Sequence, residues 1–158
     1  MSITIREARP DEIEGLIPLL TAAEPSERAL RWGLANLVDA TYRMDDGGEL
    51  VGAADMQWRG DPCEIMELAI AAERRGQGLG RQLLLWLIDE ARRRGKRRLL
   101  VGTTNASLGN IAFYQKCGLR MDHVRRDYFG YYERHYGGPK FEHGIQVRDM
   151  LVLSCDLR

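Results

Sequence analysis

A short run of glycines and arginines at residues 74–81 has the composition of a loop that binds a phosphate group. Its glycines stand at alternate positions, Gly76, Gly78 and Gly80, where they would weaken a strand or a helix, because glycine loses more conformational entropy on folding than other residues. Such a loop directs free backbone N–H groups and the positive end of a helix dipole toward one point. The run therefore favours a phosphate or pyrophosphate site, with the neighbouring arginines as cationic partners.

The segments on either side of this loop have regular apolar patterns. Residues 65–70 are mostly apolar and predict a strand, whereas Leu79, Leu83 and Leu87 recur at helical spacing. The predicted order is strand, glycine loop, helix. A turn that joins a strand to a helix without binding a ligand is the alternative that these residues leave open.

Two other phosphate-binding loops do not fit the spacing. A Walker-type loop needs Gly-Lys-Ser or Gly-Lys-Thr, and neither tripeptide occurs. A dinucleotide fingerprint, G-x-G-x-x-G, would need a glycine where Arg81 stands. These mismatches disfavour a nucleotide-dependent oxidoreductase or phosphotransferase. The spacing that fits is R-x-x-G-x-G, at Arg75, Gly78 and Gly80.

The composition limits the classes of function. A chain of 158 residues predicts one domain, residues 1–158, with a single core. Basic and acidic residues balance at 23 each, so no overall positive charge points to nucleic acid, and the arginines at 92–94 fit the negative end of a helix. Three cysteines without C-x-x-C and three scattered histidines indicate reduced thiols and no metal. The absence of a signal peptide and of an apolar span predicts a cytoplasmic protein without membrane attachment.

The remaining pattern predicts alternating short strands and helices. Before the glycine loop we expect strands at 2–7, 41–44, 49–58 and 63–70. A helix is expected to begin at 10–11, with Asp11 as its cap, and to stop at 22–25, and Ser26 is expected to cap a second helix. Tight turns between consecutive strands indicate an antiparallel meander. After the loop we expect a helix to about Arg94, a strand at 98–103 parallel to 63–70, a short helix within 105–119, strands at 120–127 and 148–157, and an aromatic loop at 128–146.

A second motif, residues 110–119, reads Asn-Ile-Ala-Phe-Tyr-Gln-Lys-Cys-Gly-Leu. Together with R-x-x-G-x-G it resembles the GNAT superfamily of N-acetyltransferases, and the resemblance covers about half of the chain. The usual Gly-Phe of that family is Gly-Leu here, at Gly118 and Leu119. The resemblance implies an α+β fold with three layers: a mixed, mostly antiparallel central sheet with splayed strands four and five, and helices on both faces.

The resemblance also implies how acetyl-CoA binds as the acetyl donor, in the gap between those strands. The implied pyrophosphate site comprises Arg75, Gly76, Gln77, Gly78, Leu79, Gly80 and Arg81. The pantetheine arm would pair with the main chain at Leu68 and Ile70 like an added strand, and Asn110 would meet it through its side-chain amide.

The implied chemistry is direct transfer of the acetyl group to a primary amine. The resemblance gives Glu67 the role of general base through a water, the Ile70 N–H that of oxyanion donor, and Tyr114 that of acid for the departing thiolate. A solvent-facing or ion-paired Glu67 and a core Tyr114 are the structural alternatives. A ternary complex needs no enzyme nucleophile, so Cys63 and Cys117 are expected to be plain thiols.

The acceptor is less defined by the sequence. The family builds acceptor pockets from regions that correspond to 24–36 and 128–146, and Asn105 is a candidate contact. The acceptor is expected to be a small molecule or a peptide amine, and Asp127, Glu133 and Glu142 either attract a cation or are solvated surface residues. A homodimer is left open. A non-catalytic acyl-CoA sensor on the same fold is the alternative function.

Overall fold

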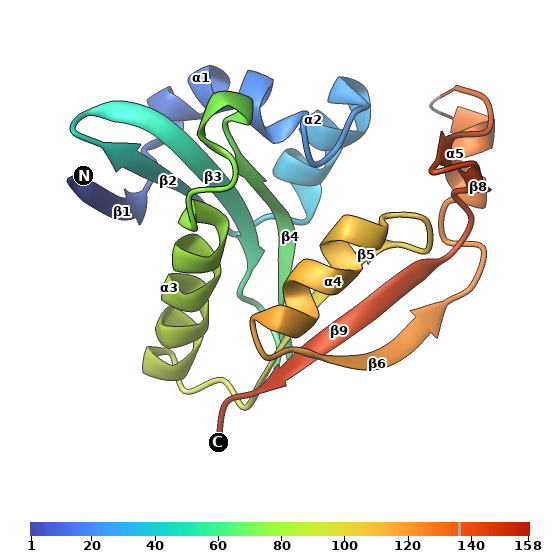
Figure 1. Ribbon diagram of the computed structural model, residues 1–158. Helices are drawn as coiled ribbons and strands as arrows, with labels where there is room; N and C mark the ends of the chain where they lie inside the picture. The colour runs from blue at the N-terminus through green and yellow to red at the C-terminus, as the bar shows by residue number, and fades with distance from the viewer. Residues whose placement is uncertain (136) are drawn as a thin grey trace.

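The computed structural model describes residues 1–135 and 137–158, in which a seven-stranded sheet has the order β1-β2-β3-β4-β5-β9-β6 (Figure 1). Its strands are β1 (Ile3–Glu7), β2 (Ala40–Asp46), β3 (Glu49–Gln57), β4 (Cys63–Ile70), β5 (Arg98–Thr104), β6 (Arg120–Arg125) and β9 (Met150–Asp156). The helices are α1 (Ile13–Leu20), α2 (Glu27–Asn36), α3 (Leu79–Arg93), α4 (Leu108–Lys116) and α5 (Gly130–His135), with short 3-10 turns η1 (Pro10–Glu12) and η2 (Ala72–Arg74). A separate hairpin is formed by β7 (Phe141–Glu142) and β8 (Ile145–Gln146).

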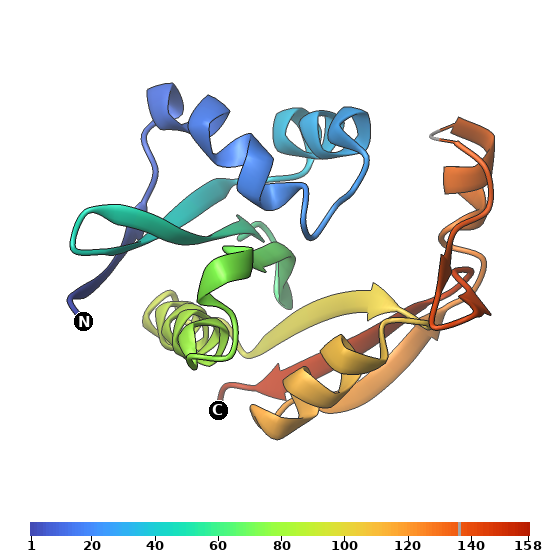
Figure 2. The ribbon, with the colours of Figure 1, turned by 45° about the horizontal axis from the view of Figure 1, so that its top comes forward.

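The first four strands form the antiparallel meander that the sequence predicts. Gly47 and Gly48 both have positive φ and make the two-residue turn between β2 and β3, a conformation that favours glycine. Helices cover both faces of this half: α1 and α2 lie on one side and α3 on the other (Figure 2). Neighbouring residues of β3 divide between the two cores, because Ala53 packs with α1 and α2 whereas Ala54 packs with α3.

The sheet opens between β4 and β5. The parallel pairing of these strands is confined to Cys63–Ile65 opposite Leu99–Val101, whereas β5 stays paired with β9 along its whole length. The predicted α+β fold with splayed strands four and five is thus confirmed. The last strand, β9, lies between β5 and β6, so the sheet ends in two antiparallel pairs formed by distant segments.

Three local predictions need correction. The aromatic segment at 128–146 is not a plain loop, because it contains α5 and the β7–β8 hairpin, whose turn places His143 and Gly144 at positive φ. Asp11 does not cap the first helix; the carboxylate of Glu12 instead accepts the Arg9 N–H at 2.8 Å. The strand at 41–44 is longer, Ala40–Asp46. Ser26 does cap α2 as predicted, accepting the Ala29 N–H at 3.2 Å. The side chains of Tyr131, Tyr132 and Glu133, and residue Tyr136, lie outside the described part.

Candidate active site

The opening between β4 and β5 contains a cavity of about 1260 Å³. The glycine loop closes one end, and the other end is bordered by residues 22–25 and by the segment around the β7–β8 hairpin. Among the predicted site residues, those that line the cavity are Glu67, Leu68, Ile70, Arg75, Gly76, Gly78, Leu79, Gly80, Arg81, Asn110 and Tyr114. Gln77 and Asn105 do not line it. The structure therefore brings most of the predicted site to one place.

The glycine loop presents a row of free backbone donors. Gly76 and Gly78 have φ of +77° and +80°, a region that disfavours other residues, and Gly78 is the N-cap of α3. Within the described residues, none of the six consecutive N–H groups of residues 76–81 donates a hydrogen bond. These groups and the positive end of the α3 dipole make the loop a binding surface for an anion.

The arginines around the loop differ in their partners. Arg74 is tied to the Asp46 carboxylate at 2.6 Å and donates to the Gln77 Oε1 at 3.1 Å, so both side chains hold the loop in place. Arg75 and Arg81 make only hydrogen bonds to carbonyls among the described residues, at Ile70 and Lys116 respectively. Their charges are therefore available to an anion at the loop, whereas that of Arg74 is not.

The third glycine of the loop packs against α4. A Cβ on Gly80 would lie 3.4 Å from the Phe113 ring, at ordinary van der Waals distance, so the start of α3 and α4 lie close together here. This contact fixes the wall that carries Asn110 and Tyr114 relative to the loop.

The free edge of β4 supplies further backbone groups. The Ala71 N–H donates to the Val51 carbonyl at 2.9 Å, so in the alternating antiparallel pattern the main-chain groups of Leu68 and Ile70 point away from β3. They face the gap, as the Arg75 Nε bond to the Ile70 carbonyl at 3.3 Å also indicates. An extended ligand can pair with this edge.

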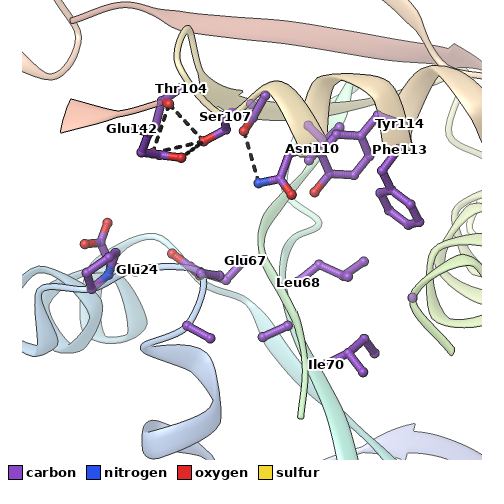
Figure 3. A pocket seen from close by; sticks show the side chains of 18 of the residues that line it. Glu24, Glu67, Leu68, Ile70, Thr104, Ser107, Asn110, Phe113, Tyr114 and Glu142 are labelled. Carbon is purple, nitrogen blue, oxygen red and sulfur yellow. Dashed lines mark hydrogen bonds between the residues drawn. The ribbon is translucent and has the colours of Figure 1, made fainter. Parts of the chain in front are cut away.

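The α4 side of the cavity carries two polar side chains (Figure 3). The Asn110 amide donates to the Thr103 hydroxyl at 3.4 Å. Tyr114 is 7 % exposed, and burial raises the pKa of its phenol to about 12, so the hydroxyl stays protonated at neutral pH. Its hydroxyl has no hydrogen-bond partner among the described residues and points across the cavity toward β4. Tyr114 is thus a neutral donor that faces open space.

Glu67 of β4 faces the cavity from the wall opposite Tyr114, and its side chain lies beside a second carboxyl group. Its direct register partner on β3 is the fully buried Asp55, so the two carboxyl groups lie on the same face of neighbouring strands. Burial, followed by the effect of Asp55, raises the pKa of the Glu67 carboxyl well above its usual range. Asp55 was not predicted as a site residue. Its one sequence signal is an acidic residue within the apolar run of β3.

Asn105 has a structural role. Its side-chain oxygen accepts the Arg148 and Asp149 N–H groups at 2.8 and 3.1 Å, and its amide donates to the Gln146 carbonyl at 3.0 Å. These bonds attach the end of β5 to the segment before β9. One amide N–H and the side-chain oxygen are engaged in these bonds, and the contact of Asn105 with the acceptor stays a prediction.

The end of the cavity away from the glycine loop carries carboxylates. Glu24, from the segment between α1 and α2, and Glu142, from β7, line it together with Glu67. The Ser107 hydroxyl donates to Glu142 at 2.8 Å, and Thr104 lies 3.3 Å from it (Figure 3). Burial raises the pKa of Glu24. The sequence did not decide whether Glu142 attracts a cation or is a solvated surface residue, because its partner Ser107 lies 35 residues earlier in the chain.

Three general features complete the description. Over residues 1–135 and 137–158 no group of three His, Cys, Asp or Glu side chains is arranged to hold a metal ion. In the same residues no helix has the length and apolar character that crossing a membrane requires. The three cysteines are free thiols, and burial raises the pKa of Cys63 to about 11.

Comparison with known proteins gives a consistent result. The acetyltransferase (GNAT) family profile matches residues 10–119. An uncharacterized N-acetyltransferase of Bacillus subtilis, YvbK, is 34% identical over 99% of the chain and 97% of its own length. An aminoalkylphosphonate N-acetyltransferase of Salmonella typhimurium is 33% identical over 73% of the chain and 81% of its own. A GNAT family acetyltransferase from Elizabethkingia anophelis, solved with acetyl-CoA bound, superposes with a TM-score of 0.84, at 30% identity and 99% coverage of both chains.

Proposed function

Because the chain belongs to the GNAT family of acetyltransferases, we propose that it transfers the acetyl group of acetyl-CoA directly to a primary amine of a small molecule or peptide. The observation that carries this proposal is the row of free N–H groups at residues 76–81, which leads along the open β4 edge to Tyr114 and Glu67. Residues 1–158 act as one catalytic domain.

The donor half of the cavity fits acetyl-CoA. The N–H groups of the glycine loop, with Arg75 and Arg81, would hold the pyrophosphate. The main chain of Leu68 and Ile70 and the amide of Asn110 would hold the pantetheine arm. A related enzyme of 30% identity binds acetyl-CoA in the same fold, which supports this assignment. Bound there, acetyl-CoA supplies a thioester carbonyl open to attack and a thiolate leaving group.

The reaction needs an amine that has lost a proton and a stabilised leaving group. An amine has a pKa of about 10, so it reaches the site mostly protonated and requires a base. Glu67 would accept that proton through a water. The nitrogen then forms a bond to the carbonyl carbon while the Ile70 N–H stabilises the oxyanion, and the C–S bond breaks as Tyr114 donates its proton to the thiolate sulfur. The second proton that the nitrogen loses restores the Tyr114 hydroxyl. The burial that keeps Tyr114 protonated supports its role as donor.

The far end of the cavity suits a cationic acceptor. Glu24, Glu67 and Glu142 border it, and negative side chains concentrate an ammonium group near the reacting carbonyl. The name of the Salmonella typhimurium relative, an aminoalkylphosphonate N-acetyltransferase, supports a primary amine as the attacking group.

Product analysis tests the proposal. Purified protein is incubated with acetyl-CoA and a panel of diamines, amino acids, aminoalkylphosphonates and short peptides, while thiol release and acetylated products are followed by thiol assay and mass spectrometry. We expect stoichiometric thiol release and acetylation for at least one primary amine, and none for its tertiary amine analogue. Tight binding of acetyl-CoA without any acetylated product would favour a sensor, and tighter binding of NAD or ATP would contradict the donor assignment.

A further inference from the structure

The carboxyl groups of Asp55 and Glu67 form a closed pair at the acceptor end of the cavity. They face each other across β3 and β4 as register partners. Asp55 is 0 % exposed, whereas Glu67 is half-buried and reaches the cavity wall. One carboxyl group of the pair can therefore touch a substrate, and the other lies entirely behind it.

The two facing oxygens of the pair lack a donor unless a proton lies between them. Asp55 Oδ1 accepts the Thr41 hydroxyl at 2.7 Å, but Asp55 Oδ2 and Glu67 Oε2 are buried and find no donor among the described residues. Two ionised carboxylates are acceptors only and cannot hydrogen-bond to each other. A single shared proton satisfies both oxygens, and the repulsion between two neighbouring carboxylates favours keeping that proton.

The surrounding groups reinforce this state. Asp55 contributes from β3 and Glu24 from the segment before α2, and both act on Glu67 as negative charges. Tyr128, from the segment after β6, is a neutral phenol whose own pKa is raised by burial and by nearby carboxylates, Glu67 included. Thr41 of β2 supplies only a hydroxyl. Lys140, just before β7, also lines the cavity and acts on Glu24. Among the described residues no positive charge acts on Glu67 itself, so burial and its neighbours favour the protonated form.

We propose that Asp55 is a positioning residue that holds one proton jointly with Glu67, so that the pair carries a single negative charge and works as a two-carboxyl proton acceptor. This inference rests on the proposed function. When the attacking nitrogen loses its proton, the cavity-facing oxygen of Glu67 takes it, directly or through a water, while the inner proton passes from Glu67 Oε2 to Asp55 Oδ2. The pair is then neutral, and the acetylated amine and the thiol of CoA are released as products.

This arrangement answers a mismatch in proton affinity. An ordinary glutamate has a pKa of about 4.3 and is a weak acceptor for a proton from an amine with a pKa of about 10. A general base works best when its proton affinity approaches that of its partner. The buried pair raises the affinity of Glu67 without adding a histidine or a metal to the site.

The state of Glu67 can be measured without activity. In protein labelled with ¹³C at the glutamate carboxyl, the Glu67 resonance is assigned by its loss in Glu67→Gln and followed against pH. We expect a midpoint at least about one pH unit above that of an ordinary glutamate, and a fall of at least about one unit in Asp55→Asn, whose amide can donate to Glu67 Oε2. Asp89→Asn, an exposed change on α3, should leave the midpoint unchanged. An ordinary midpoint in the wild type overturns the proposal, even if Asp55→Asn does not fold.

A double-mutant cycle then tests the link to acetyl transfer. Asp55→Asn and Glu67→Gln should each lower kcat/KM by about 10²-fold, and the double variant should lose little more than either single variant, because the two carboxyls act as one unit. If the decreases in kcat/KM of the two single variants multiplied in the double variant, the pairing would be overturned. Equal Glu67 midpoints in wild type and Asp55→Asn would overturn it too, and either result would leave the acetyltransferase assignment intact. Absence of acetyl transfer with a raised midpoint would contradict the proposed function alone.

Discussion

The two ends of the β4–β5 cavity are built from different kinds of groups. The donor end consists mainly of backbone: the N–H groups of residues 76–81 and the free main chain of Leu68 and Ile70. The acceptor end consists of side chains from distant segments, such as Glu24, Glu67 and Glu142. The donor end depends on conformation, and the acceptor end depends on residue identity.

The difference indicates how one fold can keep its donor and change its acceptor. Main-chain groups survive most side-chain substitutions, so long as the special φ angles and the strand opening persist. Carboxylates at the other end can be exchanged one at a time. Variants at the two ends should therefore separate donor effects from acceptor effects.

The largest effect is expected where the two ends meet, at Tyr114. Tyr114→Phe removes the hydroxyl and leaves the ring, so kcat should fall by about 10²-fold or more while the KM for acetyl-CoA changes little. Initial rates with acetyl-CoA and the best amine measure both constants. A kcat near the wild-type value would show that the thiolate leaves without this donor.

The next effect isolates the backbone of the donor end. Gly78→Ala places a side chain at a φ of +80°, which costs about 1–2 kcal/mol, so the loop should relax and acetyl-CoA should bind about 5–30-fold more weakly. Gly95→Ala, at a φ of +74° beyond the far end of α3, is the matched control. Calorimetry should find normal affinity in the control, and equal losses in both variants would mean that general destabilisation is responsible.

A smaller effect concerns the buried charge of the acceptor end and its dependence on pH. Folding raises the pKa of Glu67, so the folded state favours the protonated form. The resulting contribution to the free energy of unfolding is fully present below the pKa of the unfolded state and is lost as pH rises toward the pKa of the folded state. Glu67→Gln, which stays neutral, should gain stability relative to wild type on the order of 1–2 kcal/mol between about pH 5 and pH 9. Urea unfolding across this range measures the difference, and a constant or shrinking difference would contradict the raised pKa.

The smallest effect is expected at the rim of the acceptor end. Glu142→Gln removes one partly solvated charge, so the KM for a cationic amine should rise about twofold to fivefold, with the KM for acetyl-CoA unchanged. Asp89→Asn, an exposed change on α3, should alter neither constant. If Glu142→Gln changed only the KM for acetyl-CoA, the assignment of Glu142 to the acceptor end would be wrong.

The same contrast explains what could be predicted from the sequence. The strands, the glycine loop and α4 have local signals: alternation, helical spacing and glycines at fixed positions. These signals predicted the order of strands and helices, the resemblance to the GNAT family implied the split sheet, and the structure places Tyr114 and Glu67 on opposite walls of one cavity. The roles of these residues stay predictions.

Features that depend on distant contacts were not predictable in this way. The insertion of β9 between β5 and β6 joins segments about fifty residues apart. The hairpin turn at His143 and Gly144 lacks the Asn-Gly signal that usually marks positive φ at both positions. Asp55 stands in an apolar strand, and only the register of β3 against β4 reveals its partner.

Amide hydrogen exchange with and without acetyl-CoA tests the central claim most directly, because it observes the proposed backbone ligands themselves. We predict slower exchange at residues 76–81 and at Leu68 and Ile70 when acetyl-CoA is added, with little change in β1 and β2. Unchanged exchange in both segments at saturating acetyl-CoA, or protection confined to another part of the chain, would contradict binding at the opening of the sheet.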